Sequence, residues 1–273
     1  IIALLFVLLI GRLIYFSIFK NGIYKRQVLS QQNYSSETLP YKRGDILDRD
    51  GNTLATSQKM YTLVLEPKNI LRSEEVQKAT IDALHKYMKL DEDKLLKFIK
   101  RHKDSYYSVY REELSYSQIA DLKDFIASDK AENVSGIVFN EKYKRRYPNQ
   151  SLASQVIGFV SDGTIGTGGI EQYYNSTLSG VDGRKYKYLN EELEQDSSIV
   201  EPENGKTVVT TIDSNIQKLA EDQLSKFEKK YGSKGSSILV MNPNNGEIYA
   251  MANSTSYNLE SPRDDKNLLK KYS

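Results

Sequence analysis

A serine and a lysine spaced one helical turn apart are the residues of this chain best suited to covalent chemistry. A Ser-x-x-Lys spacing places both groups on one helix face, where the amine can manage the proton of a nucleophilic hydroxyl during acyl transfer. The one match is Ser17-Ile-Phe-Lys20, at the end of an apolar run. No Lys-Thr-Gly strand accompanies it, since Lys206-Thr207-Val208 is only a near miss. We therefore expect the pair to be non-catalytic.

A calcium loop is the second chemistry that the sequence suggests. Asp45, Asp48 and Asp50 precede Gly51, in the manner of oxygen ligands around a sharp turn. The glycine comes too early, however, and Lys59 occupies the position of the final bidentate carboxylate. We expect no metal here.

The composition excludes several classes of function. The chain has no cysteine, which excludes thiolate ligands, thiol nucleophiles and disulfides. Its two histidines, His85 and His102, lie in helix-like segments without ligand spacing. The net charge of +2 gives no case for nucleic acid, and the basic cluster at 142–146 is expected to be a solvated strand face. No cofactor is expected.

An apolar run at the start, Ile1 to Phe19, must position everything that follows. As a helix it would be roughly 28 Å long, close to the thickness of a bilayer's hydrocarbon core. We interpret residues 1–20 as a membrane anchor; a buried core helix and a cleaved signal peptide are the alternatives. Arg12 is costly at mid-bilayer, so the span is expected to begin upstream of this sequence.

The next part of the chain alternates strand and helix patterns. Alternating apolar residues on either side of Asp50-Gly51 predict a hairpin within 41–55, followed by a strand at Tyr61 to Leu65. Helices are predicted from Ser73 to Met88, from Asp91 onward and over Ser117 to Ala127, with an extended piece at Tyr106 to Tyr110. These elements should form a satellite lobe.

Beyond the lobe, the patterns indicate a change of domain near Pro202 to Lys206. Gly136 to Tyr147 predicts a strand that ends before Pro148, and Ile170, Tyr174 and Leu178 predict one short helix that ends at Gly180. Arg184 to Glu203 is acidic, polar and unpatterned, so a loop or domain boundary is expected near Pro202 to Lys206.

The last 70 residues predict a strand, a helix and a hairpin. The strand is expected at Thr207 to Ile212, the helix begins at an Asp213 or Ser214 cap, and the hairpin pairs Ser237 to Met241 with Glu247 to Ala252. The predicted organisation is an anchor at 1–20, a domain at 21–203 and the beginning of another at 204–273. The fold class is α+β.

Five local patterns, in order after a single anchor, resemble the class B penicillin-binding proteins, which are membrane-anchored peptidoglycan transpeptidases. The first three are Arg43-Gly44-x-Ile46-x-Asp48-Arg49-x-Gly51 with Leu54-Ala55; Arg146-Tyr147-Pro148 with Ala153 and Ile157-Gly158-Phe159-Val160; and Gly169-Ile170-Glu171 with Tyr174, Leu178, Gly180 and Gly183. The last two are Thr210-Thr211-Ile212-Asp213 with Asn215-Ile216-Gln217, and Met241-Asn242-Pro243-x-x-Gly246-Glu247-Ile248-x-Ala250-Met251-Ala252. Gln155 departs from the histidine that relatives often have.

The resemblance implies an elongated, mixed α/β dimerisation or pedestal domain at 21–203, then the first strand, helix and hairpin of a transpeptidase domain. It marks a set of structural motif residues: Arg43, Gly44, Asp48, Arg49, Gly51, Arg146, Pro148, Gly158, Gly169, Glu171 and Gly180. Within that set we expect carboxylate-guanidinium pairs to join distant segments in one polar core of the pedestal. Its members would be Arg43, Asp48, Arg49, Arg146 and Glu171.

The resemblance also implies a function. The parent protein would cross-link peptidoglycan by serine acyl transfer on D-Ala-D-Ala stem peptides, and would bind β-lactams, with its nucleophilic serine and its lysine beyond Ser273. This portion alone would be inactive and would anchor and position the catalytic domain outside the cytoplasm. Partners would be membrane lipid at 1–20, division or elongation proteins, and a second copy in a homodimer. A non-catalytic anchored scaffold or sensor of the cell-wall machinery is the alternative.

Overall fold

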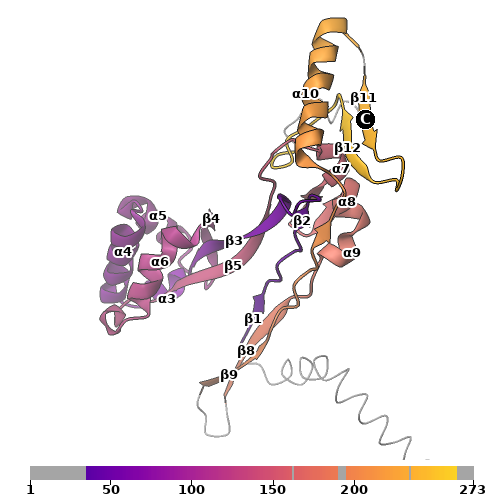
Figure 1. Ribbon diagram of the computed structural model, residues 1–273. Helices are drawn as coiled ribbons and strands as arrows, with labels where there is room; N and C mark the ends of the chain where they lie inside the picture. Colours follow the sequence, from indigo (N-terminus) through magenta and orange to yellow (C-terminus); the bar gives the residue numbers. More distant parts are fainter. Residues whose placement is uncertain (1–34, 162, 190–194, 234, 263–273) are drawn as a thin grey trace, which may run out of the picture. The chain divides into compact units, whose positions relative to one another are not determined.

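The computed structural model describes residues 35–161, 163–189, 195–233 and 235–262 (Figure 1). They belong to two compact units, one formed by 1–44 with 174–208 and the other by 45–173 with 209–273. The predicted anchor at 1–20 and the Ser17 and Lys20 pair lie outside the described residues. No helix within those described ranges is long and apolar enough to cross a membrane. The predicted domain boundary near 203 stays a prediction.

The first unit contains a three-stranded antiparallel sheet in the order β1-β8-β9. Its strands are β1 (Ser35–Leu39), β8 (Gly183–Leu189) and β9 (Gln195–Val200), and the short helix α9 (Asn175–Leu178) precedes β8. β8 and β9 lie in the stretch that showed no pattern, so sequence analysis missed both strands. No strand pattern was visible because this sheet is polar: Glu37 lies opposite Lys185 in the register, and backbone pairing determines the structure.

The second unit is built on one long strand, β3 (Thr53–Leu65). β3 pairs with β2 (Ile46–Leu47) and β4 (Ser108–Leu114), and along its length with β5 (Ile137–Arg146). A two-residue strand, β10 (Val208–Val209), joins the edge beside β2. The hairpin predicted around Asp50-Gly51 is confirmed, and Gly51 adopts the positive φ of +85° that its turn requires.

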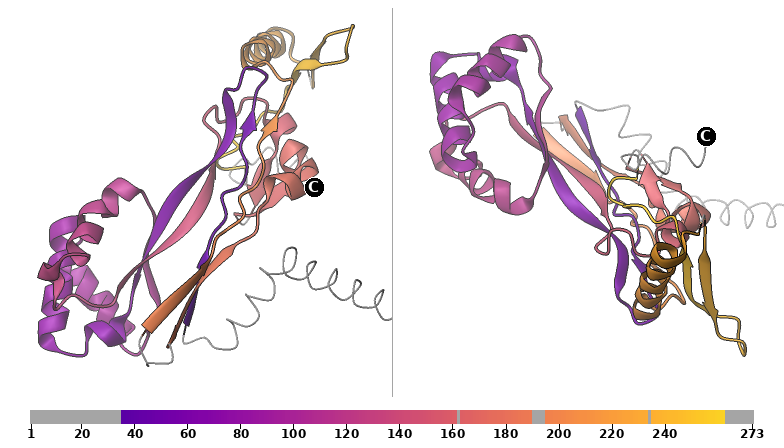
Figure 2. Two further views of the ribbon diagram at one scale, coloured as in Figure 1. Left: turned by 60° about the horizontal axis from the view of Figure 1, so that its bottom comes forward. Right: turned by 90° about the horizontal axis from the view of Figure 1, so that it is seen from above.

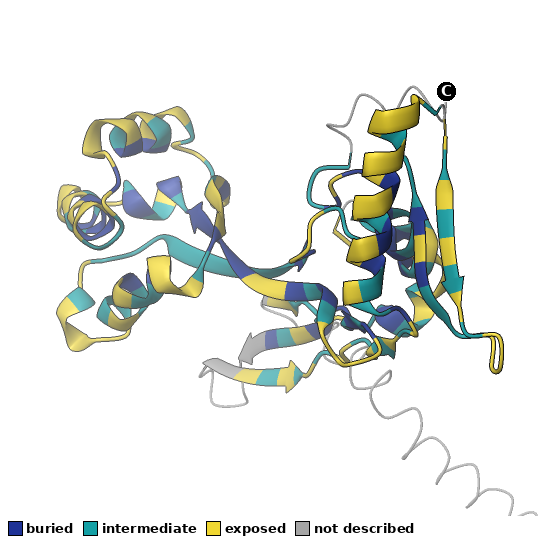
Figure 3. Cartoon of the chain, turned by 45° about the horizontal axis from the view of Figure 1, so that its top comes forward, coloured by how far each residue is buried: buried dark blue, intermediate teal, exposed yellow. Residues whose placement is uncertain are grey.

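Four helices cover the far end of the β3-β5 ribbon and form the predicted lobe (Figures 1 and 2). They are α3 (Pro67–Ile70), α4 (Glu74–Met88), α5 (Glu92–Arg101) and α6 (Tyr116–Ile126). The Ser73 side chain accepts a hydrogen bond from the Val76 amide, and the Asp91 side chain accepts one from the Lys94 amide. The two helices therefore begin after Ser73 and Asp91, as predicted. All four helices contribute buried leucine or isoleucine residues to one core cluster, and buried positions are dark blue in Figure 3.

Short elements follow β5. They are α7 (Ser154–Ile157), β6 (Phe159–Ser161), β7 (Ile165–Thr167) and α8 (Gly169–Tyr173). The single helix predicted through Ile170, Tyr174 and Leu178 is wrong. α8 ends at Tyr173, and α9 starts anew because the Tyr174 carbonyl accepts hydrogen bonds from Thr177 and Leu178.

The end of the described chain has the predicted order of strand, helix and hairpin. The Asp213 side chain caps α10 (Ser214–Tyr231) by accepting from the amides of Asn215 and Ile216. β11 (Ser237–Met241) pairs with β12 (Ile248–Asn253), and their inner face packs on α10 through Leu224, Ala250 and Ala252. The predicted strand at 207–212 is shorter than expected.

Backbone segments approach each other too closely at Gly158 for any side chain. A Cβ there would lie 2.1 Å from the Gly168 carbonyl oxygen, and a Cβ on Gly169 would lie 2.3 Å from that of Val156. Gly158 also has φ +75°, a conformation that costs other residues free energy. Gly158 and Gly169 thus allow the backbones of α7 and α8 to pass in direct contact.

We predict that Gly158→Ala lowers the free energy of unfolding by about 3 kcal/mol or more, because it combines backbone strain with a backbone clash. Gly163→Ala is the matched control, since Gly163 has φ +79° with open space around it, and it should cost only about 1 kcal/mol. Chemical denaturation of the full chain in mild detergent measures both. Equal costs for the two variants would contradict the predicted clash.

Candidate functional site

A buried carboxylate organises the turn between β2 and β3. Asp48 is fully buried and accepts hydrogen bonds from the amides of Asp50 (3.0 Å) and Asn52 (2.8 Å), and from the Asn52 side chain (2.9 Å). The Ser214 hydroxyl, at the start of α10, donates a fourth at 2.6 Å. Asp48 therefore joins the hairpin to the helix that begins more than 160 residues later in the chain.

Hydrogen bonding decides the charge of this carboxyl. Burial acts to raise the pKa of Asp48, but the hydrogen bonds, with Ser214 and Asn52 foremost, outweigh it and lower the pKa to about 2 from 3.8. The backbone reinforces the connection, because the Arg49 amide donates to the Ile212 carbonyl and the Thr210 amide to that of Leu47. The turn and the entry to α10 form one hydrogen-bonded unit.

A buried ion pair joins the end of β5 to α8. Arg145 Nε donates to Glu171 Oε1 at 2.7 Å, and the two side chains are 5% and 0% exposed. Arg145 Nη1 also donates to the Ser57 hydroxyl on β3, at 3.2 Å. A charge pair so far from water persists only with good geometry and additional hydrogen bonds, which this site supplies.

Tyr147 completes this buried cluster. Its hydroxyl donates to Glu171 Oε1 at 3.3 Å, and the ring is buried. Burial, and next the negative charge of Glu171, raise the pKa of Tyr147 well above its usual value. The phenol therefore stays protonated and acts as a hydrogen-bond donor, not as a base.

The neighbouring arginine points to a different carboxylate. Arg146 Nη1 donates to Glu260 Oε2 at 3.1 Å, and Glu260 Oε1 accepts from the Tyr147 amide at 2.7 Å. Glu260 belongs to residues 253–260, which start at the last residue of β12 and which we call the strap. The Leu259 amide donates to the Gln150 carbonyl, so the strap is also bound through its backbone.

Tyr257 and two glutamines fix the rest of the strap. The Tyr257 hydroxyl donates to the Ser154 carbonyl at 3.0 Å, and Gln155 Nε2 donates to the Thr255 carbonyl at 2.6 Å. Gln155 Oε1 accepts from the Asn253 amide group. On α10, Gln217 both donates to the Met251 carbonyl and accepts from its amide. Motif residues after β5 and the final hairpin are thus parts of one network.

In the first unit, the predicted motif residues form a crossing of three backbone segments. Arg43 is buried and donates to Asn175 Oδ1 (2.9 Å) and Ser179 Oγ (2.8 Å). A Cβ on Gly44 would lie 2.0 Å from the Lys206 carbonyl oxygen, and one on Gly180 2.0 Å from that of Glu203. These glycines are required by close backbone contact.

The expectation of one polar core was wrong for Arg146 and Arg49, which do not lie in the buried cluster around Glu171. Glu171 pairs with Arg145, whereas Arg146 pairs with Glu260, because adjacent residues of β5 point to opposite faces. The solvated strand face expected at 142–146 fails for the same reason, since Arg145 is buried. Arg49 is exposed and lies over the Tyr249 ring, 4.4 Å from its centroid.

Sequence reasoning missed Arg145, Ser214 and Glu260. Ser214 could have been identified, because it is the first residue of a predicted helix, and the amino-terminal end of a helix favours a nearby carboxylate such as that of Asp48. Glu260 had none, since its partners lie more than 110 residues away. Pro148 is exposed and follows the last residue of β5, as predicted for a strand end.

The arrangement supports structure and recognition, not bond chemistry. Its carboxylates are held by fixed donors and its phenol is held protonated, so neither is available as a general base. Within the described residues, no group of three His, Cys, Asp or Glu could hold a metal ion. The roles of the motif residues stay predictions.

Comparison with known proteins gives the same family from sequence and from structure. Residues 38–210 match the family described as "Penicillin-binding Protein dimerisation domain". The probable peptidoglycan D,D-transpeptidase PenA of Neisseria meningitidis is 28% identical over 96% of this chain and 44% of that protein. The chain therefore spans less than half the length of that relative.

Two solved structures share the mixed α/β fold. Penicillin Binding Protein 2X from Streptococcus thermophilus has a TM-score of 0.69 and 25% identity, over 85% of this chain and 37% of that one. The complex of PBP2 with MreC from Helicobacter pylori contains a similar chain, with a TM-score of 0.56 and 24% identity. The match covers 83% of this chain and 44% of that one.

We predict that Arg145→Ala lowers the free energy of unfolding by about 3–5 kcal/mol, because it leaves the Glu171 carboxylate buried without its counter-charge. Arg146→Ala is the matched control one residue away; its pair with Glu260 is partly exposed, at 32% and 26%, and should contribute about 1 kcal/mol. Denaturant unfolding of the full chain gives both values. A larger loss of stability for Arg146→Ala would mean that the pair of Arg146 with Glu260, and not that of Arg145 with Glu171, is the more stabilising one.

A second prediction follows from the lowered pKa of Asp48. Because the folded pKa lies below the unfolded value of 3.8, the carboxylate's contribution is fully present above about pH 5 and disappears as pH falls toward 2. Asp48→Asn should therefore cost on the order of 1–2 kcal/mol at pH 7 and almost nothing near pH 2. Asp50→Asn, which removes an exposed carboxylate of the same turn, is the control. A pH-independent difference between Asp48→Asn and the unmodified chain would exclude the linkage.

Proposed function

The chain belongs to the penicillin-binding proteins that carry the dimerisation domain, and from this premise we propose that it is the amino-terminal part of a membrane-anchored peptidoglycan D,D-transpeptidase. In this proposal residues 1–20 anchor it in the cell membrane, and the described residues hold the catalytic domain outside the cytoplasm. The nucleophilic serine and its lysine are contributed by sequence beyond residue 273. The portion described here does not acylate.

The observation that carries this proposal is the double attachment of the final helix and hairpin to the family-matched region. The match ends at residue 210, just before α10 begins. Asp48 binds Ser214 at one place, and Arg146 and Tyr147 bind Glu260 at another. Two attachments separated along the chain resist rotation as well as displacement, which suits a support for an active site that must keep its orientation.

Partner binding is part of the proposal. PBP2 of Helicobacter pylori, a structural neighbour, was solved in a complex with MreC. We infer that this chain likewise docks a protein of the elongation or division machinery, and that it forms a homodimer through its dimerisation domain.

The proposal is tested by fluorescent penicillin labelling of membranes. The complete reading frame should take the label, and replacing the serine of a Ser-x-x-Lys motif beyond residue 273 should abolish labelling. Residues 1–273 expressed alone should take none, because acyl transfer needs a nucleophile and partner motifs on one sheet-and-helix scaffold.

Two controls make the result decisive. Ser17→Ala in the 1–273 chain removes its one Ser-x-x-Lys match, so labelling that disappears in this variant would place the nucleophile at the membrane and contradict the proposal. A complete reading frame that is correctly folded and membrane-bound, yet takes no label, would replace the transpeptidase with a non-catalytic scaffold.

A further inference from the structure

The outer face of α5 carries a row of basic side chains. Leu95 and Ile99 bury the inner face of this helix in the lobe core. Four exposed cations lie on the other side of the helix, at i+3 and i+4 spacing from one another. They are Lys94, Lys97, Lys100 and Arg101, with Lys103 just beyond the helix. Four exposed carboxylates flank them, Asp91, Glu92 and Asp93 at the amino-terminal end and Asp104 at the other.

These cations are not used within the lobe. As far as the structure describes the chain, none of the five forms an ion pair. This differs from the ribbon of the same lobe, where Lys59 pairs with Glu141 and Lys144 with Glu113. The ribbon thus pairs its basic side chains with carboxylates, whereas the cations of α5 have no ion-pair partner among the described residues.

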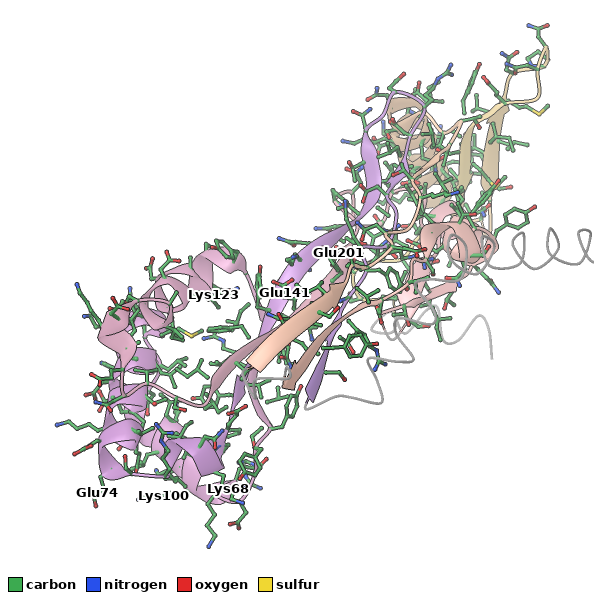
Figure 4. The ribbon with its side chains drawn as sticks, turned by 90° about the horizontal axis from the view of Figure 1, so that it is seen from below. Lys68, Glu74, Lys100, Lys123, Glu141 and Glu201 are labelled. Atoms are coloured by element: carbon green, nitrogen blue, oxygen red, sulfur yellow. The ribbon has the colours of Figure 1, made fainter. Side chains whose placement is uncertain are left out.

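Tyrosines extend the basic row at its carboxyl end. The Lys68 ammonium lies 4.6 Å from the centroid of the Tyr106 ring, and the Lys68 amide donates to the Ser105 carbonyl. α3 and α5 are in contact, and Lys68 and Lys100 lie at the same end of the lobe (Figure 4). Tyr106 and Tyr107 are 56% and 61% exposed.

The exposed tyrosines are held in place by their surroundings. The Ser105 hydroxyl accepts from the Tyr107 amide and donates to the Tyr107 carbonyl, which fixes the turn. The Tyr107 hydroxyl accepts from Asn140 Nδ2 at 3.0 Å. The two adjacent exposed rings and the neighbouring cations together form one continuous surface of aromatic and basic side chains.

We propose that this surface, formed by Lys68, Lys94, Lys97, Lys100, Arg101, Lys103, Tyr106 and Tyr107 and called here the basic-tyrosine surface, docks on an anionic lipid headgroup layer. Basic side chains are attracted to anionic lipids, and tyrosine rings favour the interface between water and hydrocarbon. The apolar face of α5 is buried in the lobe, so docking is peripheral and α5 does not insert. The proposal rests on the membrane anchoring of the proposed function, which attaches the chain to a bilayer.

The absence of cysteine allows a direct measurement of lobe position. Asp104→Cys places one environment-sensitive fluorophore within the basic-tyrosine surface of the full chain, and Ser225→Cys places one on an exposed site of α10. Each labelled chain is reconstituted in vesicles of phosphatidylcholine alone or mixed with phosphatidylglycerol. Quenching by a headgroup-labelled lipid reports contact with the bilayer surface.

We expect quenching at residue 104 in phosphatidylglycerol vesicles only, lost at high salt, and no lipid dependence at residue 225. Each cation near the surface contributes about fivefold to the docking equilibrium, so Lys94→Gln, Lys97→Gln and Lys100→Gln together should weaken docking about a hundredfold. The matched control, Lys218→Gln, Lys226→Gln and Lys229→Gln on α10, should leave the quenching unchanged.

Three results would overturn the proposal: no quenching at residue 104, equal quenching in both vesicle types, or equal loss in the two triple variants. A fluorophore response to an acidic protein or polymer, without one to phosphatidylglycerol, would assign the surface to that partner instead. Flotation with phosphatidylcholine vesicles tests the anchor separately. If the chain does not float, the anchoring of the proposed function fails, and the response of residue 104 to added phosphatidylglycerol vesicles still decides the lobe proposal.

Discussion

The buried carboxylate of Glu171 is the constraint on which the second unit depends. An ionised group with no exposure to water must be neutralised by a fixed counter-charge, and Arg145 provides it from the end of β5. That requirement fixes the register of a strand that pairs with β3 over ten residues, and it fixes where α8 sits against that strand. The tight glycine contacts at Gly158 and Gly169 follow, because α8 can reach Arg145 only by crossing α7 closely.

Periodicity and cap chemistry predicted most of the local elements. The helices after Ser73, Asp91 and Asp213 and the hairpins around Gly51 and Gly246 are local structures whose signals lie within a few residues. The sheet of β1, β8 and β9 was missed because its strands carry charges on both faces, so backbone pairing between distant segments, which leaves no periodic trace, defines it. α8 and α9 were merged because apolar spacing alone does not show where a helix is interrupted.

In the candidate site, too, local features could be predicted and contacts between distant segments could not. The motif residues were found from the sequence, but their partners were not, because the partner of a buried charge can come from any element. Choosing between Arg145 and Arg146 required knowing which face of β5 is covered, which is a tertiary property. Glu260 and Ser214 then turn separate local motifs into one network that reaches the final hairpin.

The first unit is discontinuous, since its sheet needs β1 from before residue 45 and β8 and β9 from after residue 174. Between them lie residues 45–173, which belong to the second unit and include the lobe. As the chain leaves the ribosome, β1 therefore waits unpaired until more than 130 further residues have been made, while the lobe can already fold. Such an order leaves an open strand edge during synthesis, so a chaperone that shields residues 35–44 would improve the yield of native protein more than one that acts on the lobe.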